Sequence, residues 1–100
     1  MKNKYGEFHD EQFARYRKKL HGLIHWLLIY AEENNGMLDH YFDKVQLKLN
    51  GLNELLLYPP QLVEIMSLVE AARIEWNKES YRHEVYRKLV LDAHELIDSI

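Results

Sequence analysis

The amino-acid sequence predicts an all-α protein, an antiparallel up-and-down bundle of four helices that forms a single domain over residues 1–100. Apolar residues recur at steps of three and four along most of the chain, which is the period of an α-helix. Hydrophobic residues make up 47% of the sequence, and it contains only four glycines and two prolines. This content is too apolar and too poor in helix breakers for a disordered segment. A chain of 100 residues supports one core, and short connections favour antiparallel neighbours.

The first helix is predicted over residues 10–34. Its apolar stripe has steps of three and four and consists of Phe13, Tyr16, Leu20, Leu23, Leu27 and Tyr30. Asp10 can cap the N-terminus, and Gly36 can supply the left-handed residue that closes the helix. Residues 1–8 are mostly polar, and we expect them to be flexible.

A second helix is predicted over residues 39–57, although Val45 to Leu49 also alternates like a short strand. We favour the helix because a longer helical stripe contains that segment. The stripe consists of Phe42, Val45, Leu49, Leu52 and Leu55. Asn50-Gly51 marks a potential kink. Tyr58-Pro59-Pro60 ends the helix, since a residue before proline avoids helical geometry.

The last 40 residues, 61–100, contain no glycine or proline, so they are compatible with one long helix. The phase of the apolar pattern argues for two helices instead. On one helical wheel, the apolar residues of 62–76 and of 85–100 centre roughly 120° apart, which is more than the drift of a heptad pattern explains. We therefore predict helices over 60–77 and 81–100, with a break near Asn77 to Ser80.

Composition and charge exclude several classes of function. The chain has no cysteine, which excludes a disulfide scaffold, a thiolate zinc site and a cysteine nucleophile. Its formal net charge is −3, so we expect no nucleic-acid partner. The most apolar stretch, Leu23–Ala31, is far shorter than the ~20 residues that span a bilayer. We expect a cytoplasmic protein that binds no membrane and needs no cofactor.

The first helix carries more apolar surface than a minimal bundle needs. Trp26 and Ile29 lie off its core stripe, and Gly22 beside them would let a neighbouring helix approach closely. This pattern fits a central helix that contacts all three others, or a surface for a protein partner or for a second copy in a homodimer. Residues 1–22 hold six Lys or Arg against three Asp or Glu, which could steer a charged partner. The predicted partner-binding residues are Gly22, His25, Trp26, Ile29, Arg15, Arg17, Lys18 and Lys19.

The six histidines raise the alternative of metal binding. His21 and His25 are four residues apart on the first helix, as two ligands of a zinc site would be. Gly22 rather than glutamate follows His21, so the H-E-x-x-H pattern of metalloproteases is not present. We favour two histidines that line a packed or half-exposed helix face, and keep the metal site as the alternative.

The fourth helix offers a catalytic alternative, because His83, Arg87 and His94 lie along one edge of its apolar face. Glu79 and Asp98 are each four residues from a histidine, and such carboxylates can tune an imidazole for general acid–base chemistry. Arg87 could hold a phosphate. The pair Arg87 and His94 resembles the Arg-x(4–6)-His pattern of HEPN ribonucleases, small helical bundles that cleave RNA as dimers. This resemblance implies a dimeric, metal-independent ribonuclease or toxin.

The function that we predict is a small, non-catalytic helical interaction protein, which binds a protein partner, self-associates, or does both. Compact bundles of this length are frequent among inhibitors, immunity proteins and accessory factors of bacteria and their phages. That comparison rests on size and shape and on no motif. The ribonuclease is the alternative function.

Overall fold

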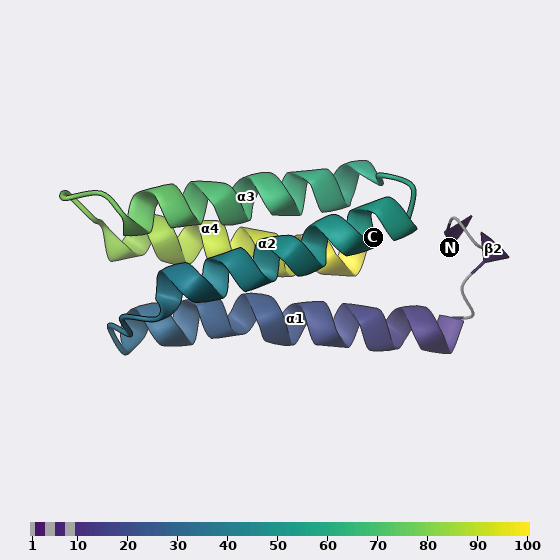
Figure 1. Cartoon of the computed structure of the whole chain (residues 1–100), viewed down its shortest axis with the longest axis horizontal. Coiled ribbons are helices and arrows are strands. Elements are labelled where there is room, and N and C mark those ends of the chain that lie inside the picture. Colours follow the sequence, from purple (N-terminus) through teal and green to yellow (C-terminus); the bar gives the residue numbers. More distant parts are fainter. Residues whose placement is uncertain (1, 4–5, 8–9) are drawn as a thin grey trace.

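The computed structural model describes residues 2–3, 6–7 and 10–100. The described residues form four α-helices and a closing 3-10 turn, and Figure 1 shows the helices side by side along the long axis. The elements are α1 (Asp10–Glu32), α2 (Leu38–Leu55), α3 (Pro60–Trp76), α4 (His83–Leu96) and η1 (Ile97–Ser99). The predicted all-α, four-helix bundle is confirmed. It is elongated, with extents of 45 × 21 × 19 Å.

Two short strands precede the bundle. Strand β1 (Lys2–Asn3) pairs antiparallel with β2 (Gly6–Glu7), so that Lys2 lies opposite Glu7. No pattern in the sequence predicted this pairing. The other positions of the segment expected to be flexible, residues 1, 4, 5 and 8, lie outside the described residues, and its flexibility stays a prediction.

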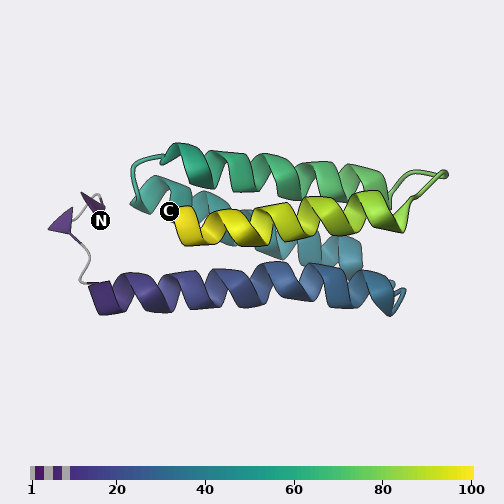
Figure 2. The same ribbon diagram turned by 180° about the vertical axis from the view of Figure 1, so that it is seen from behind.

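The helices pack around the bundle in chain order. Helix α1 packs against α2 and α4, and α3 packs against α2 and α4, so α1 lies diagonally opposite α3 (Figures 1 and 2). The main neighbours of α1 are therefore α2 and α4, and the alternative of a central helix that packs against all three others is not what the principal contacts show. Among the helices that the structure describes, none is both long and apolar enough to cross a membrane.

The α1–α2 turn and the interior of α2 differ in detail from what the sequence predicted. Helix α1 closes through Asn34, whose φ is 53°, and Asn35 N–H donates to the carbonyl oxygen of Tyr30 at 2.9 Å. Asparagine tolerates the left-handed region, so Asn34 takes the role predicted for Gly36. Helix α2 includes Val45 to Leu49 and continues through Asn50-Gly51, which confirms the helix favoured over the strand and shows no break at the potential kink.

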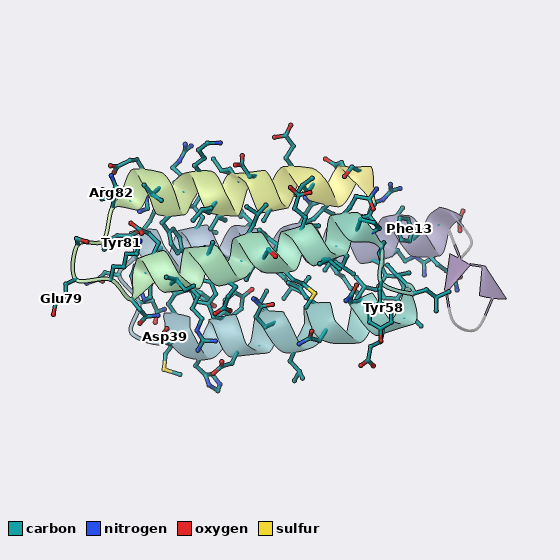
Figure 3. The ribbon with its side chains drawn as sticks, turned by 90° about the horizontal axis from the view of Figure 1, so that it is seen from above. Phe13, Asp39, Tyr58, Glu79, Tyr81 and Arg82 are labelled. Carbon is teal, nitrogen blue, oxygen red and sulfur yellow. The ribbon has the colours of Figure 1, made fainter. Side chains whose placement is uncertain are left out.

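The break between α3 and α4 is confirmed, and a buried carboxylate holds it. Glu75 is only 3% exposed, and its carboxylate accepts hydrogen bonds from Lys78 Nζ at 3.0 Å and from the backbone N–H of Arg82 at 3.1 Å. The hydrogen bond from Lys78 lowers the pKa of Glu75, which keeps the carboxylate charged. Helix α4 begins at His83, two residues later than predicted. This turn lies at the opposite end of the bundle from Tyr58 (Figure 3).

Tyr86 is the largest fully buried side chain, and it contacts the three other helices. Its hydroxyl donates to the carbonyl oxygen of Leu27 on α1 at 2.6 Å. Its ring lies 6.3 Å from that of Phe42 on α2 and 5.9 Å from that of Trp76 on α3. Burial raises the pKa of Tyr86, so the hydroxyl remains a protonated donor.

The first prediction concerns this hydrogen bond. We expect Tyr86→Phe to lower the free energy of unfolding by about 1 kcal/mol, because a buried donor is lost while the ring is kept. Tyr58→Phe is the control, since Tyr58 is 61% exposed and its loss of a hydroxyl should change little. Urea unfolding of both variants measures the effect, and equal stability of the two variants would contradict the role given to Tyr86.

The second prediction concerns the α2–α3 corner. Leu57 and Tyr58 have φ values of 62° and 59°, in the left-handed region that costs a non-glycine residue roughly 1–2 kcal/mol. We expect Leu57→Gly to raise the free energy of unfolding by about 1 kcal/mol, because glycine adopts this conformation without steric cost. Leu57→Ala keeps the strain and serves as the control in thermal unfolding. A Leu57→Gly protein no more stable than Leu57→Ala would refute this account.

Candidate functional site

A surface groove of about 460 Å³ runs between α1 and α2. The α1 wall consists of Tyr16, Lys19, Leu20, Gly22, Leu23 and Trp26, and the α2 wall of Lys48, Gly51, Leu52 and Leu55. Figure 1 shows why there is room here, because α2 starts beside α1 at their connecting turn and then leans away from it toward α3. Most lining residues are apolar, so the groove exposes hydrophobic surface that the bundle itself does not cover.

Two glycines in helix interiors widen the groove. A Cβ atom added to Gly22 or to Gly51 would meet no other atom within 4 Å, so neither glycine is required by close packing within the chain. Glycine inside a helix costs about 0.5–1 kcal/mol relative to alanine. The structure therefore accepts this cost at one position on each wall of the same groove, and the result is added space.

The charged residues of the groove are both cationic. Lys19 lies on the α1 wall and Lys48 on the α2 wall, and across the described part of the chain neither forms an ion pair. A smaller hollow of about 210 Å³ next to the groove shares Tyr16 and Lys19 with it and adds Arg15. Positive charge therefore continues from the groove toward the N-terminus of α1.

The residues predicted to bind a partner do not all lie on one surface of the structure. Gly22 and Trp26 line the groove, where Trp26 is 45% exposed and its ring lies 5.3 Å from that of Tyr30. Ile29 is half-buried. His25 is exposed on the side of α4, with its ring 6.3 Å from that of His94. The predicted set therefore borders two different seams of the bundle.

The basic residues predicted on the first helix are also divided. Arg15, Lys18 and Lys19 are exposed, and of these Lys19 lines the groove. The guanidinium of Arg17 instead lies over the Phe13 ring, 4.9 Å from its centroid. The α2 wall was missed altogether. The signal that could have indicated it was Gly51 inside a helical stripe, one turn after Lys48.

A second cluster of polar residues lies on the α1–α4 seam. His21 Nε2 lies 2.8 Å from Asp98 Oδ1, and His21 Nδ1 lies 3.0 Å from His94 Nε2. A carboxylate only accepts, so in neutral His21 the Nε2–H donates to Asp98 and Nδ1 accepts from the Nε2–H of His94. The result is a directed chain of hydrogen bonds from His94 through His21 to Asp98.

Burial lowers the pKa of His94, with smaller contributions from the nearby His21 and His25, while Asp98 opposes the shift. Asp98 was predicted to serve His94 from the same helix, but its hydrogen bond goes to His21. The seam therefore favours the neutral form of His94.

Nothing in the described structure supports the metal alternative. No group of three His, Cys, Asp or Glu among the described residues could hold a metal ion. The geometry of His21 gives the reason, because its two ring nitrogens contact two different partners, His94 and Asp98. Among the described residues, His21 and His25, the two candidate ligands, therefore have no third ligand beside them.

The residues of the catalytic alternative, His83, Arg87 and His94, lie at separate positions along α4. His83 Nδ1 lies 2.7 Å from the hydroxyl of Tyr81, and His83 Nε2 lies 3.7 Å from Glu32 Oε1. His83 and His94 are eleven residues apart, which is about 16 Å along a helix, so they do not belong to one site. Arg87 is exposed, whereas His94 is directed toward His21 on α1.

The third prediction follows from the lowered pKa of His94. Because the folded protein binds this proton less readily than the unfolded chain, the contribution of His94 to stability is fully present above the unfolded pKa of about 6.5 and is lost as the pH drops below it. We expect His94→Gln to weaken this loss of stability between about pH 8 and about pH 5. His40→Gln on the exposed side of α2 should leave it intact. Urea midpoints at both pH values test this, and an unchanged loss in His94→Gln would contradict it.

Comparison with known proteins supplies no family for the chain. No protein-family model, curated protein or solved structure matches it.

Proposed function

We propose that this protein is a non-catalytic interaction module that binds a protein partner through the α1–α2 groove. The observation that supports this proposal is the groove itself, an apolar hollow of about 460 Å³ that two interior glycines widen. A contiguous exposed apolar surface on a small protein is typical of an interaction site. An inhibitor, immunity or accessory protein of bacterial or phage type, located in the cytoplasm, would act in this way.

The exposed tryptophan strengthens the proposal. Trp26 leaves 45% of its surface accessible although it lines an apolar groove, and tryptophan is among the residues that contribute most energy to protein interfaces. Leu20 and Leu52 are nearly buried beside it. A partner side chain inserted here would remove this apolar surface from water, at about 25 cal/mol for each Å².

A second candidate is the ribonuclease, which the hydrogen-bonded chain at His94 favours. His21 and Asp98 could position the imidazole of His94 for proton transfer. RNA cleavage lost in both Arg87→Ala and His94→Ala, and retained in Trp26→Ala, would favour this candidate over the groove.

The fourth prediction uses the two glycines to close the groove without unfolding the protein. We expect Gly22→Leu and Gly51→Leu to abolish partner capture, because the new side chains occupy the open space. Leucine is the better helix former by about 1 kcal/mol, so loss of the fold is not expected.

The measurement is capture from native lysate with quantitative mass spectrometry, together with thermal unfolding of each variant. Gly36→Leu is the matched control, since position 36 also has open space but lies in the α1–α2 turn. Proteins captured equally by wild type, Gly22→Leu and Gly51→Leu would show that the groove is not the binding surface.

A further inference from the structure

The α1–α2 groove joins apolar walls to two lysines that have no carboxylate partner in the described part of the chain. We infer that its occupant is an amphipathic α-helix of the partner protein, with an apolar stripe that fills the groove and glutamate or aspartate at the stripe's edges. This inference rests on the proposed function and specifies the chemistry of the partner.

The shape of the groove favours a helix as the occupant. Its walls are two antiparallel helices, and a groove of this kind accepts the side chains at positions i, i+3, i+4 and i+7 of a third helix. Leu23 and Leu55 are half-buried on opposite walls, and they offer apolar contacts on both sides. Gly22 and Gly51 remove side chains that would hold the incoming backbone at a distance.

The charges favour an acidic helix. Lys19 and Lys48 lie on different helices, so a helix between them would meet one ammonium group at each edge. Lysine stems can lie along apolar surface while the ammonium stays at the rim, where it is placed to pair with a carboxylate. The protein as a whole carries a formal charge of −3, so this positive rim is a local feature and not a result of overall charge.

A second hollow, on the α3–α4 side of the bundle, is lined mainly by acidic residues. Its volume is about 650 Å³, and these acidic residues are Glu64, Asp92, Glu95 and Asp98. An acidic helix is repelled there and attracted to the α1–α2 groove, so electrostatics selects one of the two hollows.

The acidic hollow of a second copy could also meet the lysines, but such a contact joins two different surfaces. Contacts of that type continue into open chains unless the rotation closes a ring. A separate partner helix satisfies the lysines without this consequence, and it is the occupant that we favour.

The experiment uses three synthetic helical peptides that share one leucine stripe and carry glutamate, glutamine or lysine at its edges. Their binding to the full chain is measured by fluorescence anisotropy at low salt. Two partly exposed charge pairs contribute about 0.2–1 kcal/mol each, so we expect the glutamate peptide to bind about twofold to thirtyfold more tightly than the glutamine peptide. The lysine peptide should bind most weakly.

The same peptides are then measured on two double variants. Lys19→Glu/Lys48→Glu should reverse the order of affinities. The matched control Lys44→Glu/Lys88→Glu, which changes the net charge equally, should keep that order.

Each contrary result has a distinct meaning. Equal binding of the glutamate and glutamine peptides, or an unchanged order in Lys19→Glu/Lys48→Glu, would overturn the acidic helix while leaving the groove as a binding surface. Failure of all three peptides to bind would overturn the helix as occupant, and the capture experiment would still test the proposed function. Peptide binding that survives Gly22→Leu and Gly51→Leu would place the site outside the groove. A wild-type dimer in light scattering that Gly22→Leu converts to a monomer would identify a second copy as the occupant and overturn the inference.

Discussion

The hydrogen bond from the Tyr86 hydroxyl to the carbonyl oxygen of Leu27, at 2.6 Å, sets the relation of α4 to α1 on which the rest of the bundle depends. In an antiparallel pair, one fixed contact determines all the others. The register that places Tyr86 beside Leu27 also places His94 beside His21 and His83 near Glu32. The histidine chain therefore depends on the same α1–α4 register as the hydrogen bond of the buried Tyr86 hydroxyl.

Helix α2 is the second neighbour of α1, and side chains near the start of α2 bind it to α1. The Tyr41 hydroxyl donates to the carbonyl oxygen of Leu23 at 2.9 Å, and its ring meets that of Tyr30 edge-on at 4.9 Å. Burial raises the pKa of Tyr41 to about 12, so the donor proton is retained at neutral pH. Beyond this contact α2 leans toward α3 (Figure 1), and the groove lies between the diverging helices.

Helical periodicity was enough to predict the four helices, because each apolar stripe depends only on neighbours along its own segment. Trp26 and Gly22 were identifiable for the same reason, since both lie off the core stripe of α1. Lys48 and Gly51 were not identifiable, because their role depends on which face of α2 is turned toward α1, and tertiary packing decides that. The contact of Asp98 with His21 rather than His94 was hidden in the same way, since it requires the register between α1 and α4. The left-handed residue at Asn34 was missed because glycine and asparagine both suit it and two candidates stood close together.

Three residues of the groove, Gly22, Gly51 and Trp26, are not the residues that would make the isolated bundle most stable. Alanine at positions 22 and 51 would strengthen both helices by about 1 kcal/mol each, and nothing within 4 Å would obstruct its Cβ atom. A less exposed side chain than Trp26 would reduce the apolar surface in contact with water. The two glycines and Trp26 all line one apolar hollow with a lysine on each wall, and each of them is a choice that does not favour the isolated bundle. A bound helix of the proposed kind would offset this loss by covering that surface, and on the proposal made above the groove is one half of an interface.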